Sequence, residues 1–234
     1  MTIPLIKVPR YKMTLPFSKE VVEYRPFLVK EEKILIMAKE SQDANTIIEA
    51  MGDVVRDCTG GKIDVNNDPM FDVQYAFLQI RGKSIGEEIE YFLRCGKCDN
   101  KTTTSTNVND FTLQTHLGHS NVIKLDHTTT VTMRYPTFNH FIKLFDNDEE
   151  LRNIYEVVAE CIKTIVTDEE VTEVKKEDKK EMVQFVDNLL PEQFERLEQF
   201  FTTIPILQYT ATYVCGECGE TNHVRVDGIN NFFD

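Results

Sequence analysis

The segments Cys95-Gly96-Lys97-Cys98 and Cys215-Gly216-Glu217-Cys218 share a C-G-x-C motif and lie roughly half the chain apart. Each follows a run in which apolar residues alternate with polar ones, and each precedes a polar segment typical of a strand. The glycine after the first cysteine is expected to allow the sharp turn between the strands. A strand, this motif and a second strand form the pattern of a zinc knuckle. The four flanking strands are predicted at 88–93, 101–106, 207–214 and 220–226.

Thiolate chemistry indicates which kind of metal site this pattern can form. Two cysteines three residues apart on a hairpin tip can occupy two corners of a tetrahedron with Zn–S distances near ~2.3 Å. A second tip supplies the other two corners, so we predict that Zn²⁺ binds Cys95, Cys98, Cys215 and Cys218. Four sulfur ligands leave no open position for water, so such a site is structural. It can contribute about 10 kcal/mol or more of apparent folding free energy.

Other uses of the four cysteines are a redox C-x-x-C motif, a disulfide or plain buried thiols. A redox motif of the thioredoxin type would occur once, at a helix N-terminus, whereas this motif occurs twice between strands. His116, His119 and His223 lie near enough in the pattern to replace a ligand, but four cysteines leave no vacancy. Cys58 and Cys161 fall on apolar faces of predicted helices and are expected to be small buried side chains.

Composition limits the classes of function. The chain has 234 residues, enough for one large domain or two small ones, and no window approaches the ~20 apolar residues of a membrane span. Paired cysteines without a secretion signal favour a reducing compartment and a metal over disulfides. The net charge of -13 would repel a polyanion, and neither motif is surrounded by a basic cluster. Nucleic-acid binding is therefore disfavoured.

Hydrophobic periodicity predicts an α+β fold in which the two distant C-G-x-C hairpins form a zinc-ribbon-like β region accompanied by two helical lobes. A helix is predicted at 30–41, and a second one follows Asp43 and ends at Gly60-Gly61. Residues 148–165 are predicted as one helix and 167–181 as an exposed charged segment. The expected domains are an extended arm with the first strand (1–25), a helical lobe (26–83), the β/zinc region (84–135 with 205–234) and a second helical lobe (137–203).

The sequence contains no recognisable catalytic motif. No histidine lies in a recognisable hydrolase motif, and a glycine-rich phosphate loop is missing. Gly82-Lys83-Ser84 is similar to the end of such a loop, but it follows a predicted helix instead of a strand and is interpreted as a helix C-terminus. We therefore expect a protein that is not an enzyme.

Seven segments, taken in chain order, carry a resemblance to a known family: 15–17, 24–35, 38–41, 78–87, 133–137, 200–205 and 227–233. They resemble the baseplate hub proteins of T-even-like contractile-tailed bacteriophages. The resemblance implies a hub subunit, or an assembly factor that helps the hub form, with other baseplate hub or tail proteins as partners. It places the protein in the host cytoplasm during assembly, or in the tail baseplate of the virion. It does not imply the metal.

The contacts with these partners are expected in three places: the N-terminal arm, Arg25-Pro26-Phe27 and the terminal pair Phe232 and Phe233. The two terminal aromatics could instead pack on the zinc ribbon. The alternative function is a zinc-ribbon nucleic-acid-binding or transcription factor, which a steep loss of binding with added salt would reveal.

Overall fold

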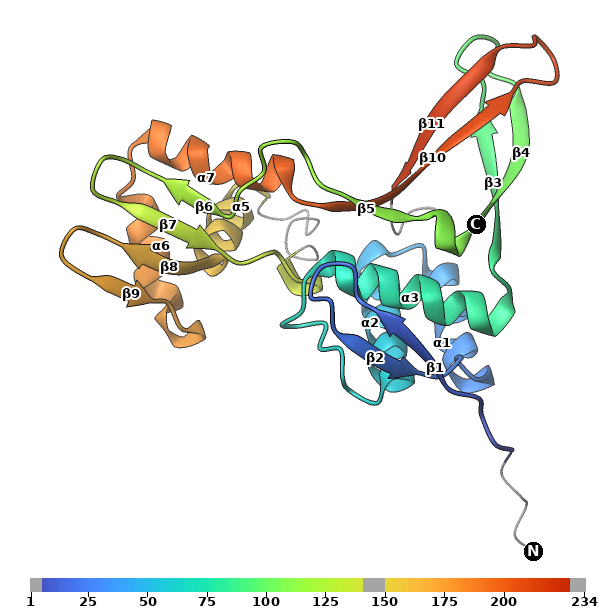
Figure 1. Cartoon of the computed structure of the whole chain (residues 1–234), viewed down its shortest axis with the longest axis horizontal. Coiled ribbons are helices and arrows are strands. Elements are labelled where there is room, and N and C mark those ends of the chain that lie inside the picture. The colour runs from blue at the N-terminus through green and yellow to red at the C-terminus, as the bar shows by residue number, and fades with distance from the viewer. Residues whose placement is uncertain (1–5, 141–149, 228–234) are drawn as a thin grey trace, which may run out of the picture. The chain divides into compact units, whose positions relative to one another are not determined.

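The computed structural model describes residues 6–140 and 150–227, and the chain divides into two compact units (Figure 1). The first unit combines Met1–Gln114 with Ile206–Asp234, and the second is Thr115–Pro205. Both contain helices and antiparallel sheets, so the predicted α+β class is confirmed. Within the described residues, no helix combines the length and apolar character needed to cross a membrane.

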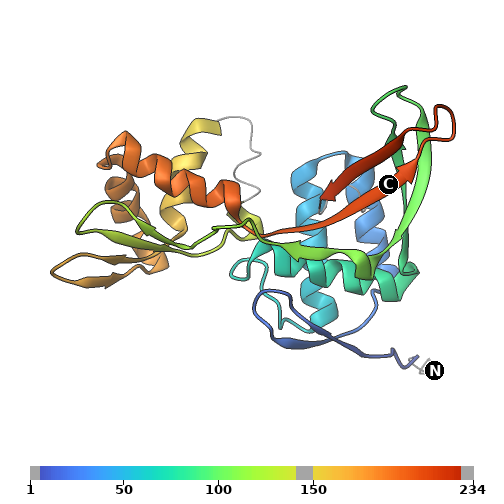
Figure 2. The ribbon, with the colours of Figure 1, turned by 45° about the horizontal axis from the view of Figure 1, so that its top comes forward.

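The first unit begins with a two-stranded sheet, in which Tyr11 pairs with Tyr24, and continues into three helices. Figure 2 shows α1 and α2 side by side, with α3 next to them. Their shared core is apolar and includes the fully buried Tyr24, Met51 and Phe77. The elements are β1 (Tyr11–Thr14), β2 (Val21–Tyr24), α1 (Val29–Ser41), α2 (Ala44–Thr59) and α3 (Met70–Ile85).

The ends of α2 follow the predicted signals. The Asp43 carboxylate accepts a hydrogen bond from the backbone N–H of Thr46 at 2.7 Å, which satisfies one of the free donors of the first turn. Gly60 has a φ of 66°, in the left-handed region that ends many helices and favours glycine. Both boundaries of this helix are therefore confirmed.

Gly82 lies in the last part of α3, where the sequence predicted a helix C-terminus. A Cβ added there would lie 2.9 Å from Cγ2 of Val108, which belongs to the short 3₁₀ helix η1 (Val108–Asp110). The absence of a side chain thus lets η1 approach α3 closely. This packing leads the chain from the helices into the strands that follow.

Two long hairpins carry the cysteine motifs (Figure 1). In the first, β3 (Glu88–Arg94) pairs with β4 (Lys101–Asn107), and in the second, β10 (Ile206–Val214) pairs with β11 (Thr221–Asp227). A short strand, β5 (Thr112–Gln114), joins the other edge of β10. Each hairpin keeps an unbroken antiparallel register up to its tip, so both motifs lie at the ends of regular ladders.

The second unit packs helices against a four-stranded antiparallel sheet of order β6-β7-β8-β9. Its core consists of buried apolar side chains from both layers, among them Val131, Ile162, Leu197 and Phe200. The elements are β6 (Val122–Lys124), β7 (Thr130–Met133), α5 (Glu150–Glu160), β8 (Ile162–Val166), β9 (Val171–Glu173), η2 (Lys176–Asp178), α6 (Lys179–Asp187) and α7 (Pro191–Thr203).

One helix prediction was wrong in this unit. The expected helix 148–165 ends at Glu160, and Ile162–Val166 is instead the strand β8, which pairs with β7. Ile162 and Ile165 are buried in the strand, but they also continue the 3.6-residue stripe of the helix, so the apolar pattern fits both structures. The β-branched residues of Ile-Lys-Thr-Ile-Val are compatible with a strand, and the pairing with β7 decides for it.

Two further segments differ in detail. Residues 167–181 are largely exposed, as expected, but they also form β9, η2 and the start of α6. The strands β6 and β7, which sequence analysis grouped with the cysteine hairpins, form one sheet with β8 and β9 in the second unit. The predicted domain boundaries themselves stay a prediction. Most of the helix expected to begin at Thr137 lies outside the described residues.

Candidate metal centre

The two hairpin tips have the same backbone geometry. In the first, the N–H of Cys95 donates to the carbonyl of Asn100 at 2.9 Å, and the N–H of Asp99 donates back to the Cys95 carbonyl at 2.9 Å. The corresponding bonds in the second tip are 2.8 and 2.9 Å long. Each six-residue loop therefore presents its two cysteines in the same way, even though only the C-G-x-C residues are common to both.

The left-handed residue of each tip is not the glycine of the motif. Asp99 and Gly219, which directly follow the second cysteine, have φ values of 56° and 69°. Gly96 and Gly216 do not have a positive φ. The turns themselves span 96–98 and 216–218, so the motif glycines lie in them, but the left-handed conformation falls on the residue after the second cysteine.

The four predicted ligands lie together. The Sγ atoms of Cys95 and Cys218 are 3.6 Å apart, as are those of Cys98 and Cys215, and all four sulfurs lie within 4.8 Å of one another. A zinc ion at about 2.3 Å from each sulfur requires S···S edges of about 3.8 Å. A disulfide requires about 2.05 Å, and the four thiols are free. Within the described part of the chain, no other group of histidine, cysteine and acidic side chains has this geometry.

Hydrogen-bond donors lie near the sulfurs of Cys95 and Cys215, the two buried cysteines of the cluster, which we call the inner sulfurs. Metal-bound thiolates are usually stabilised by such donors. The backbone N–H of Lys97 lies 3.4 Å from Sγ of Cys95, and Nδ2 of Asn222 approaches the same sulfur at 3.5 Å. Nδ2 of Asn100, from the first tip, lies 3.9 Å from Sγ of Cys215 in the second. The chemistry of the donor set therefore fits Zn²⁺ bound by thiolates.

The surroundings of the individual sulfurs give the thiols different pKa values. The backbone N–H groups of Lys97 and Cys98 lower the pKa of the Cys95 thiol to about 6, and the turn of the second tip lowers that of Cys215 in the same way. The Asn100 N–H lowers the pKa of Cys98, but the proton shared with a neighbouring sulfur and burial raise it to about 12. Part of the cluster is thus ready to bind a cation at neutral pH, and the remaining protons would leave on binding.

Asn222 connects the two tips, although sequence analysis assigned it no role. Its Oδ1 accepts a hydrogen bond from the N–H of Gly96 at 3.0 Å, while its Nδ2 donates to the carbonyl of Glu220 at 3.1 Å. The exposed ion pair of Lys97 with Glu220, at 3.0 Å, also crosses between the tips but adds little stability. The signal for Asn222 is its alternation with Val224 and Val226, which places an amide at an inward strand position.

The histidines considered as substitute ligands have other contacts. His119 lies in the second unit between the hydroxyls of Tyr135 and Thr203, each at 2.9 Å. Nδ1 of His223 faces the Thr212 hydroxyl at 3.1 Å, and Nδ1 of His116 lies 2.8 Å from a carbonyl of its own loop. The cluster is formed by cysteine alone.

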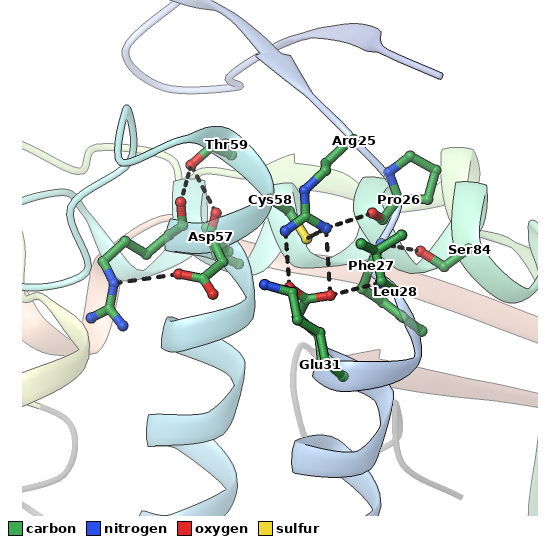
Figure 3. A network of polar contacts seen from close by, with 12 residues as sticks. Arg25, Pro26, Phe27, Leu28, Glu31, Asp57, Cys58, Thr59 and Ser84 are labelled. Atoms are coloured by element: carbon green, nitrogen blue, oxygen red, sulfur yellow. Dashed lines mark hydrogen bonds and ion pairs between the residues drawn. The ribbon is translucent and has the colours of Figure 1, made fainter. Parts of the chain in front are cut away.

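The segment predicted to contact partners is partly used inside the chain (Figure 3). The Arg25 guanidinium pairs with Glu31 at 2.9 Å, and the same carboxylate accepts the backbone N–H of Leu28 at 2.7 Å. Burial raises the pKa of Glu31, but these partners outweigh it and lower the pKa to about 2. Pro26 and Phe27 are half-buried. Partner binding at this segment stays a prediction.

Part of the N-terminal arm forms β1 and pairs with β2, and partner binding by the arm stays a prediction. The last predicted contacts, Phe232 and Phe233, lie outside the described residues.

Comparison with known proteins gives one clear relationship. No curated protein and no solved structure matches the chain. A family model described as the T4 bacteriophage base plate protein matches residues 8–234, which include both cysteine motifs and nearly the whole chain. The match confirms the resemblance drawn from the sequence. The chain therefore belongs to the T4 bacteriophage base plate protein family.

Proposed function

We propose that this protein is a baseplate hub subunit or a hub-assembly factor, which binds other baseplate proteins and contains a structural zinc site. The observation that carries the proposal is the family match over residues 8–234. A member of a baseplate family acts as part of an assembly of phage proteins. Its role is then to present surfaces to neighbours, in the host cytoplasm while the hub forms or in the tail of the virion.

The zinc site is supported by the sulfur geometry and by the low stability expected of the first hairpin alone. Strand β4 has the sequence Lys-Thr-Thr-Thr-Ser-Thr-Asn, without a large apolar side chain, and Phe92 on β3 is 66% exposed. The first hairpin is a separate two-stranded sheet, and such a hairpin is only marginally stable by itself. A shared ion would hold the two tips together with four strong bonds.

Four cysteine ligands would also define the role of the ion. Zinc with four thiolates has no free position for a water molecule or substrate, so it would support structure and not catalysis. This agrees with the non-enzymatic role that the family suggests.

Helix α1 supports protein binding. Leu35 and Ala38 face the core, whereas Val29, Ile36 and Met37, on the outward face, are 65%, 51% and 69% exposed. Apolar side chains grouped on one exposed helix face favour contact with another protein. In the chain, α1 directly follows the predicted contact segment Arg25-Pro26-Phe27.

The nucleic-acid alternative receives less support. Two basic side chains near the first tip are paired with acidic ones: Arg94 with Asp99 at 2.8 Å and Lys97 with Glu220 at 3.0 Å. The net charge is -13. Binding to DNA or RNA that falls steeply with added salt would favour this alternative over the proposal.

Affinity purification during infection tests the proposal. We would supply the tagged chain in infected host cells, capture it with its partners, and analyse captured material and purified virions by mass spectrometry. A hub subunit is expected in both samples, and an assembly factor only in the captured intermediates. Absence of baseplate proteins from the captured material would overturn the proposal.

A pair of variants locates the surface in the same experiment. Met37→Asp adds a charge to the outward face of α1 and is expected to reduce capture of baseplate proteins severalfold. Leu117→Asp is the matched control, because Leu117 is an exposed apolar residue in the second unit, at 96%. Equal capture by both variants would remove α1 from the proposed surface.

A further inference from the structure

The hydroxyl of Tyr213 is an unexplained buried group beside the four cysteines. Its side chain is 8% exposed, and its oxygen is buried with no hydrogen-bond partner among the described residues. A buried hydroxyl without a partner costs roughly 1–3 kcal/mol, so a native protein usually provides an acceptor for it. The position of this hydroxyl indicates which acceptor is missing.

Strand register aims Tyr213 toward the cluster. Tyr213 on β10 is directly opposite Asn222 on β11, so the two side chains share one face of the hairpin. Asn222 already reaches Sγ of Cys95 at 3.5 Å from that face. Cys215 follows Tyr213 by two residues and is buried on the same side. The inner sulfurs of both tips therefore lie next to the face that Tyr213 and Asn222 share.

The electrostatics agree with this placement. Burial raises the pKa of Tyr213, and the cysteines of both tips, Cys95 foremost, raise it further. The hydroxyl is thus near enough to the four sulfurs to interact with them electrostatically. A protonated hydroxyl beside sulfur is a hydrogen-bond donor, and a thiolate accepts such a bond far better than a thiol.

We propose that Tyr213 is a positioning residue of the metal centre: its hydroxyl donates a hydrogen bond to an inner sulfur, Cys95 or Cys215, when the cysteines bind the ion as thiolates. Four thiolates around one divalent cation leave a net charge of about −2 on the centre. Tyr213 and Asn222 form a layer of donors beneath it that stabilises this charge. The inference rests on the proposed zinc site and adds residues outside the four ligands.

Zinc competition and cobalt spectroscopy on the full chain test this role. Zinc affinity is measured by competition with a chromophoric chelator for the wild type, Tyr213→Phe and Tyr209→Phe. Tyr209 is the matched control, since it lies on the same strand but packs against Phe111 with ring centroids 5.9 Å apart. Tyr213→Phe is expected to weaken zinc binding about tenfold or more, and Tyr209→Phe to leave it unchanged.

Two readouts separate this role from a purely structural one. With Co²⁺ in the site, loss of the hydrogen bond raises the energy of the sulfur electrons, so the thiolate-to-cobalt absorption should move to longer wavelength in Tyr213→Phe alone. In the metal-free chain, the same substitution removes an unpaired hydroxyl and should leave thermal unfolding unchanged or slightly improved.

The outcomes distinguish this inference from the zinc site itself. If the wild type binds zinc and Tyr213→Phe matches Tyr209→Phe in affinity and spectrum, the role of Tyr213 is overturned while the site stands. If the wild type binds neither Zn²⁺ nor Co²⁺, the zinc site fails, and the role of Tyr213 fails with it.

Discussion

The pair of cysteine hairpins and the second unit of this protein are stabilised in different ways. The second unit has a continuous apolar core, whose members lie between Leu125 and Phe200 in the sequence. The hairpin tips meet through polar contacts and through sulfurs that are 123 and 117 residues apart in the sequence. Tips that meet in this way need a strong local cross-link, whereas the second unit is stabilised by apolar burial distributed over many residues.

Removal of the metal is the strongest test of this difference. Chelation, or Cys95→Ser, is expected to remove one zinc ion per chain and about 10 kcal/mol of apparent stability from the hairpin pair. Hydrogen exchange should then accelerate in residues 88–107 and 206–227, while helix α7 keeps its protection. Cys58→Ala, at a buried cysteine outside the cluster, is the control and should retain the zinc. Equal exchange with and without chelator would contradict the cross-link.

The ion pair of Arg25 with Glu31 tests a buried polar contact within the first unit. Arg25→Met leaves the Glu31 carboxylate, 1% exposed, without its main partner and is expected to cost roughly 3–5 kcal/mol in chemical denaturation. The double variant Arg25→Met with Glu31→Leu removes both charges and should recover most of this loss. A loss in the double variant as large as in the single one would show that packing, and not charge, is responsible.

The same pair predicts an acid dependence. The folded-state pKa of Glu31 is about 2, below its ordinary value of 4.5. The unfolded state therefore takes up the proton first as the pH falls, and the stability from this carboxylate, present above about pH 4.5, is lost between about 4.5 and 2. Stability measured over this range should fall more steeply in the wild type than in Glu31→Gln.

Truncation of Leu197 tests the apolar side of the comparison. Its side chain is fully buried in the core of the second unit, so Leu197→Ala is expected to cost about 2–5 kcal/mol. Leu190→Ala is the matched control, because Leu190 is 65% exposed and its loss should change stability by less than ~0.5 kcal/mol. Zinc content should be the same in both variants. A loss of zinc in Leu197→Ala would show that the two regions are not stabilised independently.

Substitution of two glycines in the second tip is expected to change stability least. Gly219 has a φ of 69°, so Gly219→Ala should destabilise the tip by about 1 kcal/mol. Gly216 does not have a positive φ and has open space around an added Cβ, so Gly216→Ala should be neutral or slightly stabilising. Thermal unfolding of the zinc-loaded chain measures both. A larger loss of stability in Gly216→Ala than in Gly219→Ala would show that the turn depends on the motif glycine.

Patterns among neighbouring residues predicted many of the helices and strands. The Asp43 cap and the Gly60 end of α2 are set by neighbouring residues, so the sequence located this helix correctly. Residues 162–166 could not be assigned in this way, because their apolar positions fit a helix and a strand equally well. Pairing with β7 decides for the strand, and that contact joins segments about thirty residues apart.

The sequence by itself determined the four cysteines, because the repeated spacing of two thiols on a hairpin tip has few chemical uses. It also determined the family, through segments spread over nearly the whole chain. Only the tertiary structure brought the two tips together and placed Asn222 and Tyr213 beneath them. Their roles depend on which face of a strand meets the other hairpin, and no local pattern contains that information.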